Sequence, residues 1–100
     1  MIVPRTRLAD QDLFELWNYI AHDNLDAADG FLEKLESIFC TIFESPKIGR
    51  SRSKDLLIPG LRSFPTGNYV ILYYPNEEGG GVIIARVFNA ARDIEPLLDE

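Results

Sequence analysis

The sequence predicts an α+β fold in which an antiparallel pair of helices packs on one face of a small antiparallel sheet. In the first half of the chain, apolar residues recur at intervals of three and four in two patterns that a few polar residues separate. In the second half, short runs of β-branched and aromatic residues alternate with turns rich in glycine and asparagine. The chain has 100 residues, so we expect one domain over residues 1–100.

The first expected elements are a brief strand and a helix. Residues 2–3 are β-branched and precede Pro4, which is tolerated in edge strands, so we expect a short N-terminal strand there. Thr6 is the expected N-cap of the helix, because its hydroxyl can accept a bond from a free N–H of the first turn. The apolar stripe of this helix consists of Leu13, Leu16, Trp17 and Ile20. Residues 23–24 interrupt the pattern.

A second helix is expected from about residue 26 to residue 45. Asp26 is placed to cap it, and Pro46 prevents its continuation. Its apolar stripe consists of Ala28, Phe31, Leu32, Leu35, Ile38, Phe39 and Ile42. Because the connection between the helices is short, we expect an antiparallel hairpin whose apolar faces need a further partner, which the following strands supply.

The second half of the chain predicts three strands in a meander. They cover residues 60–64, 69–74 and 82–88. Gly67 and Asn68 supply the first turn, and the glycine-rich residues 75–81 form the second connection. Asp93 is placed to cap a short C-terminal helix, which Pro96 limits in length.

Charge and composition exclude several classes of protein. The net charge of −6 disfavours extensive binding to nucleic acid, which depends on Lys and Arg, although residues 47–54 hold four cations and no acid. The longest apolar run has six residues, too few for a membrane span, and the N-terminus lacks the features of a signal peptide. A single cysteine, Cys40, excludes an internal disulfide. We therefore expect a cytoplasmic protein with no membrane association.

No cofactor or metal site is expected. His22 and Cys40 do not form a pair with the spacing of metal ligands, and we place His22 at the exposed end of the first helix. Cys40 lies within a helix and is expected to pack there. The glycines at 79–81 lack the pattern of a phosphate-binding loop and precede a strand. Trp17 lies on an apolar stripe and is expected to belong to the core.

Three arginines are the strongest candidates for a binding site. Arg62 and Arg86 lie on different expected strands, and Arg92 follows the last one. In a meander these strands are neighbours, so the three guanidinium groups can converge on one open face of the sheet. The alternative is that each arginine pairs with a nearby acid. The candidates for that role are Asp93, Glu95 and Asp99.

Taken together, the motifs resemble the ParE/RelE toxin superfamily of type II toxin–antitoxin systems, and its ParE-like branch in particular. The segments that carry the resemblance are ADQDLFELWNYIA (9–21), AADGFLEKL (27–35), SPKIGRSR (45–52), LRSFPTGNYVILYY (61–74) and RVFNAARD (86–93). They span nearly the whole chain in the order and approximate spacing of the family. The combination of Pro-x-x-Gly-Arg, Leu-Arg before a tyrosine-rich strand, and the terminal Arg-Val and Arg-Asp pairs is more specific than any one segment.

The resemblance implies an intracellular toxin neutralised by a cognate ParD-like antitoxin in a hetero-oligomeric complex. ParE-like members are regarded as inhibitors of DNA gyrase that act by protein contact, without catalytic residues and without specific nucleic-acid binding. RelE-like members are ribosome-dependent endoribonucleases, which gives an alternative function. A third possibility is an inert relative that binds an antitoxin and has lost toxicity.

Several residues favour the ParE-like branch. In the nucleolytic relatives an arginine follows the aromatic residue that opens the strand after the turn, whereas here Val70 follows Tyr69. No tyrosine or histidine follows Arg92, and Asn89 stands where ParE-like chains often have a histidine. Because RNA cleavage needs groups that transfer protons, we expect no catalytic residue. The expected contact residues for antitoxin or gyrase are Arg62, Arg86, Arg92 and Tyr73.

Overall fold

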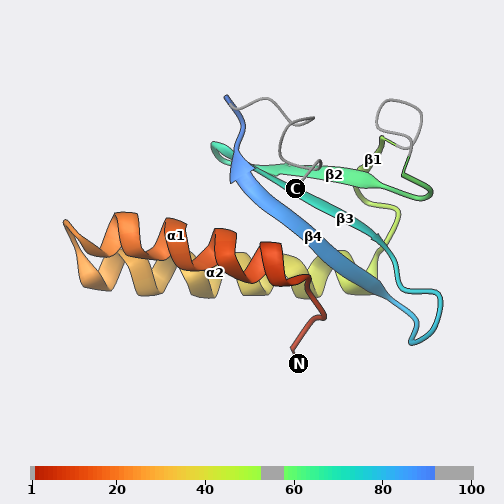
Figure 1. Cartoon of the computed structure of the whole chain (residues 1–100), viewed down its shortest axis with the longest axis horizontal. Helices are drawn as coiled ribbons and strands as arrows, with labels where there is room; N and C mark the ends of the chain where they lie inside the picture. Colours follow the sequence, from red (N-terminus) through yellow and green to blue (C-terminus); the bar gives the residue numbers. More distant parts are fainter. Residues whose placement is uncertain (1, 53–57, 92–100) are drawn as a thin grey trace.

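The computed structural model describes residues 2–52 and 58–91, which form two helices and a four-stranded sheet (Figure 1). The elements are α1 (Arg7–Ala21), α2 (Leu25–Glu44), β1 (Arg50–Ser51), β2 (Arg62–Thr66), β3 (Tyr69–Pro75) and β4 (Val82–Asn89). The strands follow the order β1-β2-β3-β4, and each is antiparallel to its neighbour. The predicted helical hairpin on an antiparallel sheet is therefore confirmed. The C-terminal helix expected after Asp93 lies outside the described residues.

Both helices begin at side chains that satisfy free backbone N–H groups. Thr6 caps α1 as predicted, with its hydroxyl accepting a bond from Ala9 N at 3.0 Å. The cap of α2 is Asn24 and not Asp26, because Asn24 has the extended backbone of a cap and its Oδ1 accepts from Ala27 N at 3.0 Å. Asp26 lies inside the first turn, where its charge faces the positive end of the helix dipole.

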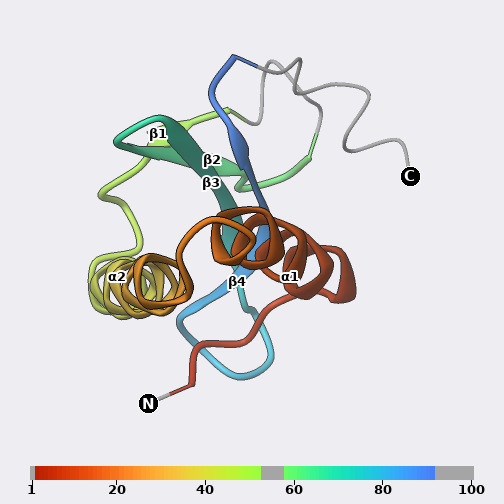
Figure 2. The same ribbon diagram turned by 90° about the vertical axis from the view of Figure 1, so that its left-hand side faces the viewer.

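The main core lies between the helical hairpin and the sheet. Figures 1 and 2 show α1 and α2 side by side on the same side of the sheet, with β4 the strand closest to them. The buried members of this core are Val3, Ala9, Leu13, Leu35, Phe39, Ile42, Ile71, Tyr73, Val82, Ile84 and Val87. A smaller cluster lies on the opposite face of the sheet and comprises Leu61, Leu72, Ala85 and Phe88. The central strands are consequently buried on both faces.

The N-terminal segment forms a single bridge to the sheet instead of the predicted strand at residues 2–3. Arg5 forms a parallel bridge with Ile84, Thr6 N donates to Ile84 O, and Ile84 N donates to Pro4 O, both at 2.9 Å. Pairing does not extend further because Pro4 has no N–H and α1 begins directly after Thr6. The N-terminus nevertheless lies along the outer edge of β4.

The sheet contains one strand that the sequence pattern did not predict and one irregularity. β1 pairs Arg50 with Ser63 and Ser51 with Arg62, in a segment where the sequence showed only an excess of cations. The register between β3 and β4 shifts between Leu72 and Tyr73, which places an extra residue in β4. The predicted turn at Gly67 is confirmed, and its φ of +57° explains the glycine.

The two candidate caps of α2 can be separated by mutation. We expect Asn24→Ala to lower the free energy of unfolding by about 1 kcal/mol, because Ala27 N loses its acceptor. Asp26→Ala loses only a screened interaction with the helix dipole, about 0.3 kcal/mol. Chemical denaturation of both variants measures the difference. A larger loss in Asp26→Ala would contradict the assignment of the cap.

Candidate functional site

Arg86 is held inside the protein by a carboxylate of α1. Its Nε donates to Asp12 Oδ2 at 2.8 Å, and its Nη2 donates to Asp12 Oδ1 at 3.0 Å. Asp12 Oδ2 also accepts from Val87 N at 3.0 Å. Arg86 is only 6% exposed, so the ion pair is buried between α1 and β4. Its partner is a residue 74 positions away in the sequence, and the nearby acids that the sequence suggested all lie outside the described residues.

Arg62 belongs to a second network, which connects the sheet to the segment after α2. Its Nη1 donates to Gly49 O at 2.7 Å, and the Tyr73 hydroxyl accepts from Gly49 N at 2.7 Å and donates to Pro46 O at 2.8 Å. A Cβ at Gly49 would lie 2.5 Å from the Tyr73 hydroxyl oxygen, so only glycine fits. This contact explains the glycine of the Pro-x-x-Gly-Arg segment.

The predicted convergence of the arginines is not found. The register places Arg62 opposite Tyr73 and Arg86 opposite Leu72, and Tyr73 and Leu72 belong to the core clusters on opposite faces of the sheet. Arg62 and Arg86 therefore lie on different faces and bind different partners. Tyr73 is 1% exposed and, like Arg86, is not part of the free surface. Arg92 lies outside the described residues.

A pocket of about 330 Å³ lies beside the Arg62 network. Its lining consists of Pro46, Lys47, Gly60, Arg62, Tyr73, Pro75, Gly81 and Val82. Burial raises the pKa of Tyr73, although the bond from Gly49 N and the charge of Arg62 oppose this shift. The Tyr73 hydroxyl at this pocket is therefore protonated at neutral pH and engaged in two hydrogen bonds. It is poorly suited to act as a base.

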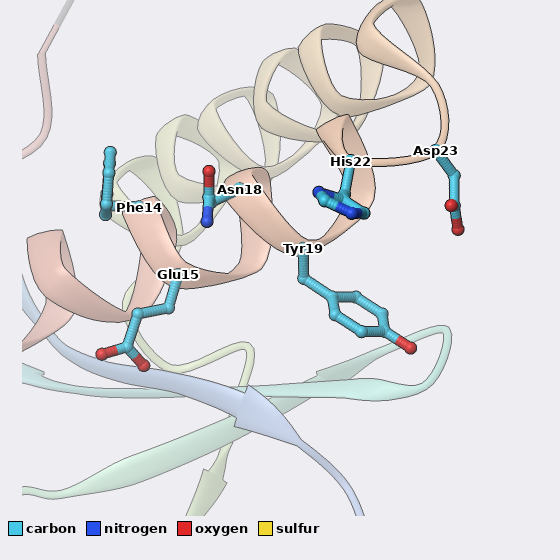
Figure 3. A pocket seen from close by; sticks show the side chains of 6 residues that line it. All are labelled: Phe14, Glu15, Asn18, Tyr19, His22 and Asp23. Carbon is cyan, nitrogen blue, oxygen red and sulfur yellow. The ribbon is translucent and has the colours of Figure 1, made fainter.

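The outward face of α1 carries exposed aromatic side chains around a broad hollow (Figure 3). The hollow is lined by Phe14, Glu15, Asn18, Tyr19, His22 and Asp23. Phe14 is 64% exposed and Tyr19 is 79% exposed, and both side chains extend away from the helix. Large exposed aromatics are typical of protein-binding surfaces. The expected position of His22 at the exposed end of the helix is confirmed.

A second hollow, of about 260 Å³, lies where α1 meets α2. Its lining consists of Arg5, Asp10, Leu13, Phe14, Trp17, Leu32 and Glu36. Trp17, which the sequence assigned to the core, is only partly buried, and its Nε1 donates to Asp29 Oδ1 at 3.0 Å. The hollow is thus lined by apolar side chains together with two acids, Asp10 and Glu36, and one cation, Arg5. Phe14 lines both hollows and connects them.

The edges of the sheet offer little opportunity for a partner to add a strand. Along β4, residues 4–6 bond to Ile84, Thr6 Oγ1 donates to Ala85 O at 2.7 Å, and Asp12 accepts from Val87 N. On the other edge, β1 covers the first residues of β2, and Pro65 has no N–H to donate. The described part of the chain therefore favours a partner that binds through side chains on the faces of the molecule.

Within residues 2–52 and 58–91, no group of His, Cys, Asp or Glu side chains is arranged to hold a metal ion. The same residues contain no helix that is both long and apolar enough to cross a membrane. Cys40 is half-buried in α2, as the sequence indicated.

Comparison with known proteins gives a consistent result. The family model described as "ParE toxin of type II toxin-antitoxin system, parDE" matches residues 3–94. Toxin ParE3 of Caulobacter vibrioides is 32% identical over 93 residues, which cover 92% of this chain and 89% of that protein. The solved structure "Chromosomal ParDE TA system from P. aeruginosa" has a TM-score of 0.66 and 17% identity, covering 89% of this chain and 95% of the other. At that identity the match supports the fold.

The buried ion pair predicts that substituting two acids of α1, Asp12 and Asp10, lowers the free energy of unfolding by unequal amounts. We expect Asp12→Ala to lower the free energy of unfolding by about 3–5 kcal/mol, because Arg86 loses its carboxylate inside the protein. Asp10→Ala is the matched control: its Oδ1 lies 3.7 Å from Arg5 Nε and its side chain is 64% exposed, so the expected loss is about 0–1 kcal/mol. Urea denaturation measures both. Similar losses would contradict a structural role for Asp12.

The Tyr73 hydroxyl predicts a loss of stability that depends on pH. We expect Tyr73→Phe to cost about 1–3 kcal/mol at pH 8, because Gly49 N and Pro46 O lose their buried partner. The folded pKa of Tyr73 lies above its ordinary value of 10.0, so this contribution is complete below pH 10. It is lost as pH rises through the folded pKa.

The measurement compares the unfolding free energies of the wild type and Tyr73→Phe at pH 8 and above pH 10. The difference should shrink at the higher pH. Tyr74→Phe serves as the control, because the hydroxyl of the half-buried Tyr74 makes no hydrogen bond to the part of the chain that the structure describes. A difference that stays constant with pH would contradict the assigned role.

Proposed function

Because the chain belongs to the family of ParE toxins of type II toxin–antitoxin systems, we propose that it acts by protein contact, inhibits DNA gyrase and is neutralised by a ParD-like antitoxin. The proposal places the toxin in the cytoplasm, in a hetero-oligomer with its antitoxin. It assigns the protein no catalytic residue and no cofactor.

The observation that carries this proposal is that the side chains best suited to RNA cleavage are already engaged in hydrogen bonds within the protein. Arg86 binds Asp12, and the Tyr73 hydroxyl is bonded to both Gly49 and Pro46. Val70 occupies the position where the nucleolytic relatives carry an arginine. Proton transfer in RNA cleavage needs a free acid or base, and neither Arg86 nor the Tyr73 hydroxyl is free for that role. Protein contact accounts for the structure better than the endoribonuclease alternative.

The surfaces described above also favour one mode of antitoxin binding. The edge of β4 is occupied from Ile84 to Val87, which disfavours strand addition there. The exposed Phe14 and Tyr19, together with the apolar hollow beside Trp17, form a surface for an amphipathic helix. We therefore place the antitoxin across the outer face of the helical hairpin. Arg62 and Arg92 remain candidate contact residues.

The functional test combines two activities of the purified toxin. We expect it to inhibit supercoiling of relaxed plasmid by DNA gyrase, and we expect the cognate antitoxin to restore supercoiling. Site-specific cleavage of mRNA on translating ribosomes, mapped by primer extension and lost in Arg62→Ala, would overturn the proposal in favour of the endoribonuclease. Toxin that binds antitoxin but affects neither gyrase nor mRNA would identify an inert relative.

The binding mode has its own test in the same preparation. Tyr19→Ser removes an exposed aromatic from α1 without emptying the core, so we expect antitoxin affinity to fall by about 1–2 kcal/mol with the melting temperature unchanged. Ile2→Ser is the matched control, because Ile2 is equally exposed but lies outside this face. Titration calorimetry measures both affinities. Equal effects of the two substitutions would contradict binding across the hairpin.

A further inference from the structure

The pocket beside Arg62 combines two cations with a largely apolar lining, and none of the contacts described above accounts for its charge. Lys47 and Arg62 both line it, in a chain whose net charge is −6. Neither side chain forms an ion pair with a carboxylate of the described residues. Positive charge concentrated at a pocket of an acidic protein indicates a site for an anion.

The guanidinium of Arg62 is positioned for such a ligand. It is half-buried, and its Nη1 is fixed by the 2.7 Å bond to Gly49 O. A guanidinium carries five N–H donors in a planar fork, and Gly49 O is the acceptor that the described residues provide. The remaining donors can bind a planar carboxylate in a bidentate manner. Because Gly49 is itself fixed by Tyr73, little ordering of Arg62 is needed on binding.

The rest of the pocket lining is apolar, and at Gly60 it leaves no room for a side chain. Pro46, Pro75 and Val82 contribute hydrocarbon surface around the cations. Gly60 has a φ of +75°, and a Cβ there would lie 2.7 Å from Pro75 Cδ, so a side chain at this position would clash with the wall. A carboxylate carried by a short hydrocarbon stem, with apolar neighbours on either side, matches this combination of walls and charge.

We propose that this pocket binds one aspartate or glutamate side chain of a protein partner, with the carboxylate between Lys47 and Arg62. This site deepens the proposed function, since it supplies a charged anchor for a partner that otherwise binds through apolar surface. A nucleic acid is the less suitable ligand, because its many phosphates would be repelled by the acidic chain as a whole. The pocket fits a single charged group with apolar neighbours.

The test uses ¹⁵N-labelled toxin and three probes. These are the capped tripeptide acetyl-Val-Glu-Val-amide, its counterpart acetyl-Val-Gln-Val-amide, and a short oligouridylate. We expect the Glu peptide to shift the amide signals of Gly49, Gly60 and Gly81 at millimolar concentration. The Gln peptide and the oligouridylate should shift them only weakly. Equal shifts with both peptides would overturn the carboxylate assignment, and tighter binding of the oligouridylate would replace it with a phosphate site.

Substitutions locate the site. Arg62→Gln should weaken binding of the Glu peptide by at least about tenfold, because the bidentate partner is lost. Lys47→Gln should weaken it by a smaller factor, and Arg62→Lys should be only partly functional. Lys34→Gln is the control, because Lys34 is an exposed cation on α2 outside the pocket. The inference is overturned if Lys34→Gln has the same effect as Arg62→Gln, or if Arg62→Gln retains wild-type affinity with its fold intact.

The peptide titration needs neither gyrase nor antitoxin. Loss of gyrase inhibition would therefore leave the carboxylate site standing, and absence of peptide binding would remove the site without affecting the proposed function.

Discussion

The carboxylate of Asp12 joins the helical hairpin to the sheet, and the rest of the structure depends on this connection. Its two oxygens bind both the guanidinium of Arg86 and the backbone N–H of Val87. Burying a charged pair costs desolvation free energy, which is offset only when the geometry is good and further hydrogen bonds are made. Here the additional hydrogen bond from Val87 N to Asp12 Oδ2 meets that condition. The same contact fixes the rotation of α1, which determines which side chains face the core and which, such as Phe14 and Tyr19, face solvent.

A second constraint acts at β2 and β3, away from the edge formed by β4. Gly49, Tyr73 and Arg62 connect the segment after α2 to β2 and β3, so each end of the helical hairpin is attached to a different part of the sheet. Both networks place a polar group in the interior and satisfy it with backbone partners. The residues of both networks support the fold. Other proteins can reach only the side chains that lie outside these networks, such as Phe14 and Tyr19.

The sequence predicted the elements that depend on neighbouring residues. Thr6 as a cap, the two amphipathic stripes and the turn at Gly67 follow from local chemistry, and all three are found. Asp26 was the wrong cap, because Asn24, two residues earlier, has the extended backbone that a cap requires. The two-residue β1 carries too short a pattern to detect.

The features missed at the candidate site are those set by long-range geometry. The partner of Arg86 lies 74 residues away, and no local pattern distinguishes Asp12 from other acids of the first helix. The convergence of Arg62 and Arg86 failed because the faces of strands depend on register, which the sequence did not specify. Tyr73 was expected to contact a partner. Its hydroxyl instead accepts one hydrogen bond, from Gly49 N, and donates another, to Pro46 O, and only the tertiary structure reveals these bonds.

The pairing between the first and last described elements also has a consequence for synthesis of the chain. During translation, α1 and α2 leave the ribosome well before β4, and Thr6 and Asp12 bond to residues 74 to 79 positions later. Contacts of such sequence separation form late, because the intervening loop must close first. The apolar stripe of the nascent hairpin therefore lacks its main partner strand until β4 has been made. A polypeptide that terminates before Val82 lacks the strand on which both helices rest, so only a nearly complete chain can acquire the toxin fold.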